Sequence, residues 1–305
     1  MRSLIKKLFF KDARIRTFSI ARLSAYDIKE QVFLQKEGLS IDVSTKHGMI
    51  CLEPFCVAVW LSLEQLNTFD PQQATLRFKR GNDTIAAINV SLIEKIVEGN
   101  CVLLLYKIIS SKNFQLIALK RLVLFSYLLR NKTSTYQYRK TLSALYSYPR
   151  KIIVVSYKDE NYCNIFPMDI QGYVQEGGMY VLGLRTTNKT LDKILTAKKV
   201  IVCDIDSVDI NTIYTLGKHP SASPPKIEEM PFGTTGSEVF NFPIPDFAEC
   251  YKEIEIIAHR KMGYHMLMVG KIVNSKVIKQ DSSSLYHVSF LEQLMVNYKT
   301  IDGVY

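Results

Sequence analysis

The chain has 305 residues, of which 47% are hydrophobic, and its formal net charge is +10. This length predicts one large domain or two ordinary ones, and the apolar fraction is sufficient for a sizeable core. The longest apolar runs are far shorter than the roughly 20 residues that span a bilayer, and the basic N-terminus lacks a secretory signal. We therefore expect a protein without a transmembrane segment.

The positive charge is concentrated in the first half of the chain. Residues 1–140 contain 22 Lys and Arg against 11 Asp and Glu, whereas residues 141–305 contain 17 against 18. This asymmetry predicts two domains of different character. A basic half is suited to an acidic partner, nucleic acid or an anionic membrane. A solvated basic surface is the simpler explanation, because the half shows no zinc-finger spacing, helix-turn-helix or basic stripe with interleaved aromatic residues.

The six cysteines do not form a metal-binding or disulfide pattern. The sequence has no C-x-x-C motif, no His at ligand spacing, and most of the cysteines lie within apolar runs. Such cysteines are typical of reduced core residues in a cytoplasmic protein. We expect no metal site.

The first half alternates strand-like and amphipathic segments. Residues 48–61 and 101–109 are predicted as buried strands, residues 84–90 as a strand and residues 91–97 as a short helix. The segment 114–129 fits either a helix or two strands. No internal repeat stands out, and the half carries no recognisable chemical motif. A polar stretch at 131–148 predicts a domain boundary, with domains at 1–145 and 146–305.

The second half is richer in strands. Strands are predicted at residues 151–157, 162–166, 178–184, 200–204 and 285–290, with a hairpin of strands 249–258 and 264–273 joined by residues 259–263. A short helix is predicted at residues 189–197, with Thr187 or Asn188 as its N-cap. Residues 217–246 are predicted as a long irregular loop. The predicted fold is mainly β (α+β): a small C-terminal barrel with a short helix, and a basic α+β N-terminal domain of unknown fold.

Two polar clusters lie at the ends of strands, where a rigid sheet can present them to a ligand. At residues 185–190, hydroxyls, cations and an amide meet the start of the predicted helix, whose unpaired N–H groups attract phosphate. At residues 164–169, a rigid segment with Pro167 offers polar groups to the edge of a flat ring. A capped helix start on the surface and a turn that closes a strand explain the same two patterns.

A third candidate is His265, in the sequence Gly-Tyr-His-Met-Leu-Met-Val-Gly that begins at Gly263. A His at a strand start could contact a cofactor, although a hydrogen-bonded structural His is the simpler interpretation. The motifs G-x-G-x-x-G, G-x-x-x-x-G-K-[ST], G-x-S-x-G and H-E-x-x-H are absent. Their absence disfavours a dinucleotide-binding fold, a P-loop enzyme and a standard serine hydrolase.

In this order, the clusters resemble the flavin reductase-like family of FMN-binding split barrels over about residues 147–305. Residues 164–169 are similar to its N-x-x-P/T-x-S segment, residues 185–194 to its phosphate segment S/R-x-x-T-x-x-x-I, and residues 263–270 to G-D-H-x-L-x-x-G. Residues 244–253 are similar to the segment that leads into a late strand. Asp169 departs from the family's Ser or Thr, and Tyr264 departs from its acidic residue.

The resemblance implies FMN binding, usually at a homodimer interface, with hydride transfer from NADH or NADPH to the flavin. It implies that Asn164, Met168 and Asp169 meet the flavin ring or ribityl chain. It implies that the phosphate is bound by Arg185, Asn188, Lys189 and Thr190. Pro167 and Thr187 complete the predicted cofactor-binding set, and His265 is the predicted catalytic residue. The alternative is a non-catalytic flavin-binding, interaction or sensor protein with a degenerate barrel.

Overall fold

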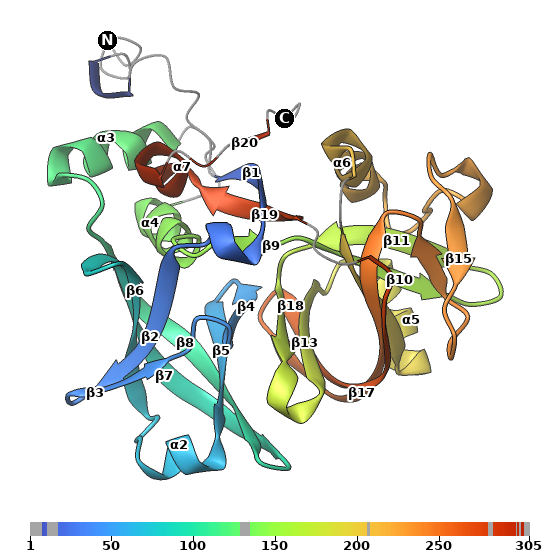
Figure 1. Cartoon of the computed structure of the whole chain (residues 1–305), viewed down its shortest axis with the longest axis horizontal. Coiled ribbons are helices and arrows are strands. Elements are labelled where there is room, and N and C mark those ends of the chain that lie inside the picture. Colours follow the sequence, from blue (N-terminus) through green and yellow to red (C-terminus); the bar gives the residue numbers. More distant parts are fainter. Residues whose placement is uncertain are drawn as a thin grey trace.

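The computed structural model describes residues 8–10, 18–128, 135–205, 208–279, 283–296, 298 and 300–301. Two seven-stranded antiparallel sheets, one from each half of the chain, lie side by side (Figure 1). A four-stranded sheet runs across the top between them. The predicted mainly β fold is confirmed.

The first large sheet comes from the N-terminal half, whose fold the sequence left open. Its strands are β2 (Glu30–Lys36), β3 (Leu39–Asp42), β4 (His47–Leu52), β5 (Phe55–Ser62), β6 (Gln73–Arg80), β7 (Asp83–Glu98) and β8 (Cys101–Asn113). The strand predicted at 48–61 is thus two strands, because Pro54 at the turn cannot continue a paired strand. The helix predicted at 91–97 is wrong. These residues extend β7, where Leu92 pairs with Tyr106 of the apolar strand β8.

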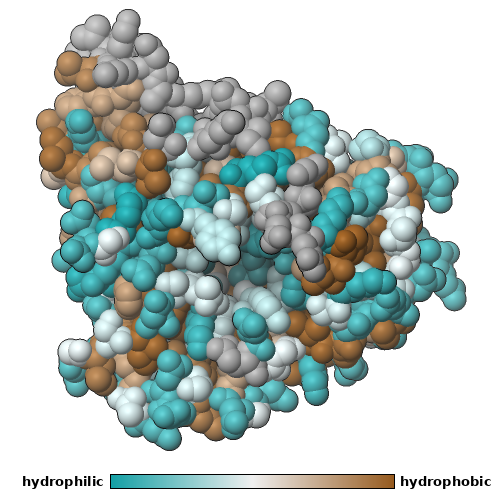
Figure 2. Space-filling model, in the orientation of Figure 1, coloured by the Kyte–Doolittle hydropathy of each residue, from teal (hydrophilic) through white to brown (hydrophobic). Residues whose placement is uncertain are grey.

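Three helices accompany this sheet. They are α2 (Leu63–Asn67), α3 (Ala118–Leu128) and α4 (Tyr136–Leu145). For the segment 114–129, the described residues show a helix rather than two strands, and residue 129 lies outside the described residues. Apolar side chains such as Leu119 and Leu122 are exposed on α3. A brown area appears in Figure 2 at the upper left, where Figure 1 places this helix.

The second large sheet comes from the C-terminal half. Its strands are β10 (Ile153–Lys158), β11 (Cys163–Met168), β12 (Gln171–Val174), β13 (Met179–Arg185), β14 (Lys199–Ile205), β17 (Ala248–Met262) and β18 (His265–Val277). The predicted helix is α5 (Lys189–Ala197), and the Asn188 side chain caps it by accepting from the Thr190 amide. The hairpin loop predicted at 259–263 is wrong, because β17 continues to Met262 and only residues 263–264 form the turn.

Several C-terminal elements were not predicted. Helix α6 (Ile210–Lys218) begins after the N-cap Asp209, and α7 (Phe290–Val296) follows the predicted last strand, β19 (Ser284–Ser289). The predicted irregular loop at 217–246 begins within α6 and contains η3 (Ile227–Glu229), β15 (Thr234–Gly236) and β16 (Pro243–Pro245). The remaining 3-10 helices are η1 (Ala25–Asp27) and η2 (Gln175–Gly177).

The two large sheets share one topology. When the seven strands of each half are numbered in chain order, both sheets have the strand order 2-1-5-6-7-4-3. In both, a helix follows the fourth strand, α2 in the first half and α5 in the second. The sixth and seventh strands are the longest in each half, with 16 and 13 residues in the first and 15 and 13 in the second. The chain is therefore a structural duplication.

The four-stranded sheet joins the ends of the chain. It has the order β20 (Thr300–Ile301), β1 (Phe18–Leu23), β19 and β9 (Arg150–Lys151). Strand β1 of the first half thus pairs with strands of the second half. The division into domains 1–145 and 146–305 remains a prediction.

The halves pack closely through β4, which contacts β12, β13 and β18. A buried cluster that includes Ile50, Trp60, Val181 and Leu267 fills this interface. A Cβ on Gly183 would lie 2.3 Å from the Ile50 carbonyl oxygen, so only glycine permits this approach. Among the described helices, none combines the length and apolar character needed to cross a membrane.

Candidate functional site

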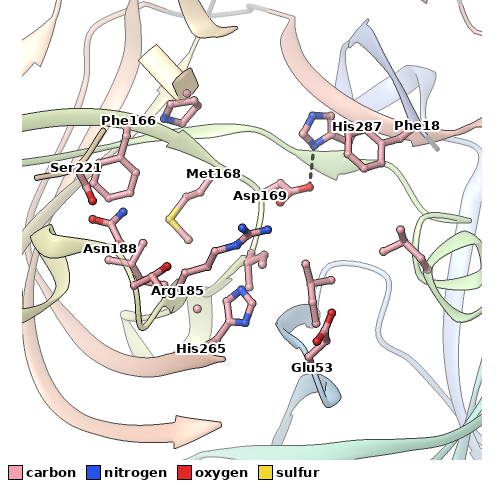
Figure 3. Close-up of a pocket in the computed structure, with 18 of the residues that line it drawn as sticks. Phe18, Glu53, Phe166, Met168, Asp169, Arg185, Asn188, Ser221, His265 and His287 are labelled. Atoms are coloured by element: carbon pink, nitrogen blue, oxygen red, sulfur yellow. Dashed lines mark hydrogen bonds and ion pairs between the residues drawn. The ribbon is translucent and has the colours of Figure 1, made fainter. Parts of the chain in front are cut away.

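A cavity of about 820 Å³ lies between the two halves, and we call it the site cavity. Its volume is within the range of ordinary ligand pockets, roughly 300–1,000 Å³. Eight of the ten predicted site residues line it: Asn164, Pro167, Met168, Asp169, Arg185, Thr187, Asn188 and His265. Figure 3 shows several of them directed toward a common space. Lys189 and Thr190 do not line it.

The junction of β13 and α5 forms one wall of the cavity. Arg185 ends β13, is exposed, and has no ion-pair partner among the described residues. In Figure 3 its guanidinium extends toward Asp169. The first amides of α5 already have partners, because Lys189 N donates to Ser221 Oγ (3.0 Å) and Thr190 N donates to Asn188 Oδ1 (2.9 Å). An anion at this wall would therefore meet side chains rather than a free helix N-terminus.

A buried hydrogen-bond network supports the second wall. Asn164 Nδ2 donates to Thr190 Oγ1 (2.7 Å), and Asn164 Oδ1 accepts from His219 Nε2 (2.7 Å). Tyr162 also contacts Thr190 through its hydroxyl (2.8 Å). Thr190 is fully buried, so it holds Asn164 in place behind the cavity instead of touching a ligand. Burial lowers the pKa of His219, which favours its neutral form.

Asp169 belongs to a three-residue cluster that the sequence did not indicate. Its Oδ2 accepts from His287 Nδ1 (2.7 Å) and from the Tyr146 hydroxyl (2.5 Å), and the first contact is the dashed line in Figure 3. Burial alone would raise the pKa of Asp169, but His287, the Tyr146 hydrogen bond and Arg150 lower it below its ordinary value. Asp169 is therefore an ionised anchor at the edge of the site cavity, and its contact with the flavin remains a prediction.

His265 is buried, with 2% of its surface exposed, and it lies at the edge of the site cavity. Its Nδ1 is 3.5 Å from Cys51 Sγ, and the Cys51 thiol donates to the Met262 carbonyl (2.7 Å). Hydrogen bonds from Cys56 and His265 lower the pKa of Cys51 to about 5. As a thiol, Cys51 donates to Met262, so in either state Sγ accepts from Nδ1–H. The other nitrogen, Nε2, then carries a lone pair, and it has no partner among the described residues. A ligand with a donor group would satisfy it.

The N-terminal half supplies the opposite wall. Its contribution consists of Phe18, Leu52, Glu53, Tyr138, Arg139 and Leu142, and Tyr146 follows at the end of α4. None of these was predicted, because the first half carries no motif and its contact with the site depends on the duplicated fold. His219, Ser221 and His287 were also missed, since each reaches the cavity from a distant segment. Among the described residues, no group of three or more His, Cys, Asp or Glu could hold a metal ion.

No family model and no curated protein matches the chain. Solved structures of flavin reductases and FMN-binding proteins are similar to about half of it. The NADH:FAD oxidoreductase SgcE6 of Streptomyces globisporus is 11% identical, with a TM-score of 0.44, over 50% of this chain and 92% of that one. Flavin reductase PheA2 is 15% identical, with a TM-score of 0.41, over 50% and 97%. An FMN-binding protein from Thermus thermophilus is 18% identical, with a TM-score of 0.38, over 43% and 71%.

Proposed function

We propose that the site cavity binds FMN and that the protein is an oxidoreductase of the flavin reductase type, which takes hydride from NADH or NADPH. The observation that carries this proposal is the convergence of two separate polar segments, at 164–169 and 185–188, on one cavity of about 820 Å³. A flat phosphorylated ligand needs a cationic group for its phosphate and a partly apolar wall for its ring, and these two segments offer both.

The residues present fit this cofactor in two respects. Arg185 has no ion-pair partner among the described residues and offers a planar donor fork to a phosphate, with Thr187 and Asn188 beside it. His265 Nε2 is a buried acceptor that still needs a donor. Pro167 and Met168 would face the ring. When bound, the flavin itself would supply the two-electron chemistry.

The chain's own groups would position the ligand and exclude water. Cys51 fixes the tautomer of His265 and leaves Nε2 to face the ligand. The Asp169 carboxylate accepts a hydrogen bond from Nδ1 of His287, so the His287 ring keeps one orientation at the cavity. Leu52, Tyr138 and Leu142 cover the side opposite β11 and lower the local polarity.

The first experiment is an absorption spectrum of the purified full chain with added FMN, followed by NADH and NADPH oxidation assays. Arg185→Ala should weaken FMN affinity about 10-fold or more, because a hydrogen bond to a charged group is worth about 1.5–3 kcal/mol. Lys189→Ala is the matched control and should leave the affinity within about twofold, because Lys189 does not line the cavity. Unchanged affinity in Arg185→Ala would remove the phosphate assignment.

A flavin-binding protein without turnover is the second candidate. One observation favours it: the space beside His265, between Glu53, Tyr138 and Tyr264, is only about 210 Å³. This is below the roughly 300 Å³ of small ligand pockets, so room for a nicotinamide donor is limited. A yellow protein that oxidises neither NADH nor NADPH would establish this candidate instead.

We also propose two domains, at residues 1–145 and 146–305, in a cytoplasmic protein. All six cysteines are free, which supports reducing surroundings. The predicted homodimer and the acidic partner of the basic half remain predictions. The N-terminal half already supplies the opposite wall of the site cavity, which supports a site that is complete in one chain.

A further inference from the structure

A second cavity of about 370 Å³ also lies between the halves. Residues 44–46, which follow β3, and His47, the first residue of β4, line it together with β12 of the other half. The site cavity is lined by the segment that follows β11 and by the end of β4 from the other half. Strands β3 and β11 are the second strands of the two halves, and β4 and β12 are the third. The two cavities are therefore lined in part by corresponding segments of the two halves.

His47 presents an unsatisfied group at the second cavity. Its Nδ1 contacts the Val43 carbonyl at 2.8 Å, and because a carbonyl only accepts, Nδ1 carries the proton. Its Nε2 is thus an acceptor, and it is buried without a partner among the described residues. Burial and the charge of Arg150 lower the pKa of His47 to about 3, so the ring stays neutral. A ligand that occupies the cavity would supply an O–H or N–H donor.

The charge of the second cavity is positive. Among the described residues that line it, four are cations (Lys46, Arg150, Lys151 and Lys252) and two are carboxylates. One carboxylate, Asp204, lies 3.2 Å from Lys151 and 3.3 Å from Lys252, and Lys151 also lies 4.0 Å from Glu249, which does not line the cavity. The other, Asp169, is held by His287 and Tyr146. Arg150 is buried, its guanidinium donates to the Leu145 carbonyl (3.0 Å), and its charge helps to lower the pKa of Asp169 without a direct ion pair. The excess of cations favours an anionic ligand.

The walls of the second cavity are aromatic. Trp60, Tyr148, Tyr173, Tyr180 and Tyr286 line it. His47 meets the Tyr148 ring edge-on, with centroids 5.1 Å apart and an interplanar angle of 73°. The junction of β5 and α2, which corresponds to the Arg185 junction, does not line this cavity. A phosphorylated cofactor is therefore not the expected occupant, and a smaller flat molecule is.

We propose that the second cavity is a separate binding site for a small aromatic anion that carries an O–H or N–H donor. The donor would bond to His47 Nε2, the anionic group would face the lysines and Arg150, and the ring would lie among Trp60 and the tyrosines. This proposal does not depend on FMN binding, because the residues that carry it differ from those that would hold the cofactor.

Three probes test the chemistry on the full chain by isothermal titration calorimetry. They are 4-hydroxybenzoate, benzoate, which lacks the donor, and 4-hydroxybenzamide, which lacks the charge. We expect 4-hydroxybenzoate to bind at least fivefold more tightly than either of the others. Saturable binding should also change the emission of Trp60, the only tryptophan in the chain. Absence of saturable 4-hydroxybenzoate binding at millimolar concentration would overturn the proposal.

Matched variants then locate the binding. Thr45 is exposed and lines the second cavity, whereas Thr187 is exposed and lines the site cavity. Thr45→Trp should abolish 4-hydroxybenzoate binding and leave FMN affinity unchanged, and Thr187→Trp should do the reverse. His47→Phe keeps a ring in the core and should weaken 4-hydroxybenzoate binding about 10-fold while benzoate binding changes little. Loss of 4-hydroxybenzoate binding in Thr187→Trp but not in Thr45→Trp would overturn the assignment to the second cavity.

Discussion

His287 Nδ1 lies 2.7 Å from Asp169 Oδ2, and this contact joins β19 to the segment that follows β11. The two residues are 118 positions apart in the chain. Tyr146, at the end of α4, donates to the same carboxylate oxygen. One largely buried carboxylate thus ties the segment after β11, the four-stranded sheet and the end of α4 together at the edge of the site cavity.

Asp169→Asn should destabilise the fold by about 2 kcal/mol, because two hydrogen bonds would lose their ionised acceptor. The folded-state pKa of Asp169 is below its ordinary value, so this contribution is present above about pH 4 and is lost as the pH falls through the folded value. Urea unfolding at about pH 7 and about pH 3 measures this. The difference between wild type and variant should shrink at the lower pH.

The control for this prediction is Asp159→Asn. Asp159 pairs with Lys193 at 2.7 Å, but its side chain is 32% exposed. Exposed ion pairs contribute about 0–1 kcal/mol. Equal losses of stability in the two variants would contradict the anchoring role of Asp169.

Cys51→Ala should lower the rate of NADH or NADPH oxidation about 10-fold while FMN affinity stays within about threefold. The thiol holds Nδ1 of His265 at 3.5 Å, and without it the imidazole loses its fixed tautomer. Steady-state kinetics with saturating FMN would measure the rate, and flavin fluorescence would measure the affinity. Cys203→Ala is the control, because Cys203 is equally buried and lies in β14 opposite Tyr251, whereas Cys56 contacts Cys51 itself. An equal fall in the oxidation rate of both variants would indicate a packing effect and would contradict the positioning role of Cys51.

Local patterns explain what was predictable in the candidate site. Helix α5 was predicted with its observed bounds, because Asn188 is a strong N-cap and Leu191 and Ile194 repeat at helical spacing. The orientation of that helix determines which of its side chains reach the site cavity. Thr190 faces the core and Lys189 faces solvent, so neither of these two predicted contacts lines the cavity, whereas Arg185 and Asn188 do. The sequence of the strand-to-helix junction thus predicted one wall of the cavity more reliably than it predicted which individual side chains line that wall.

Long-range relationships account for what was missed. His219 meets Asn164 across 55 positions, and no local pattern marks such a pair. The duplication was invisible for a related reason: a strand constrains only the alternation of buried and exposed side chains, so two sheets of equal topology can share little sequence. The sequence therefore left the fold of the first half open, although that half supplies Leu52, Glu53 and Tyr138 to the cavity.

Gly263→Ala should separate the halves at the site, and it is the sharpest test of their contact. Gly263 has a φ of +60°, and a Cβ there would lie 1.9 Å from the Glu53 carbonyl oxygen, which also accepts from Tyr264 N (3.0 Å). Gly178→Ala is the matched control, since Gly178 has a φ of +58° and nothing within 4 Å of its Cβ position.

Both variants pay the left-handed backbone penalty of about 1–2 kcal/mol, but only Gly263→Ala must also displace Glu53. We therefore expect a clearly larger fall in unfolding free energy for Gly263→Ala, together with weaker FMN binding, because Glu53 and the neighbouring Leu52 line the site cavity. Urea unfolding and flavin titration of the two variants measure both effects. If the variants lost equal stability and bound FMN equally well, the close approach of the β4–β5 turn to the β17–β18 turn would not be needed for the site.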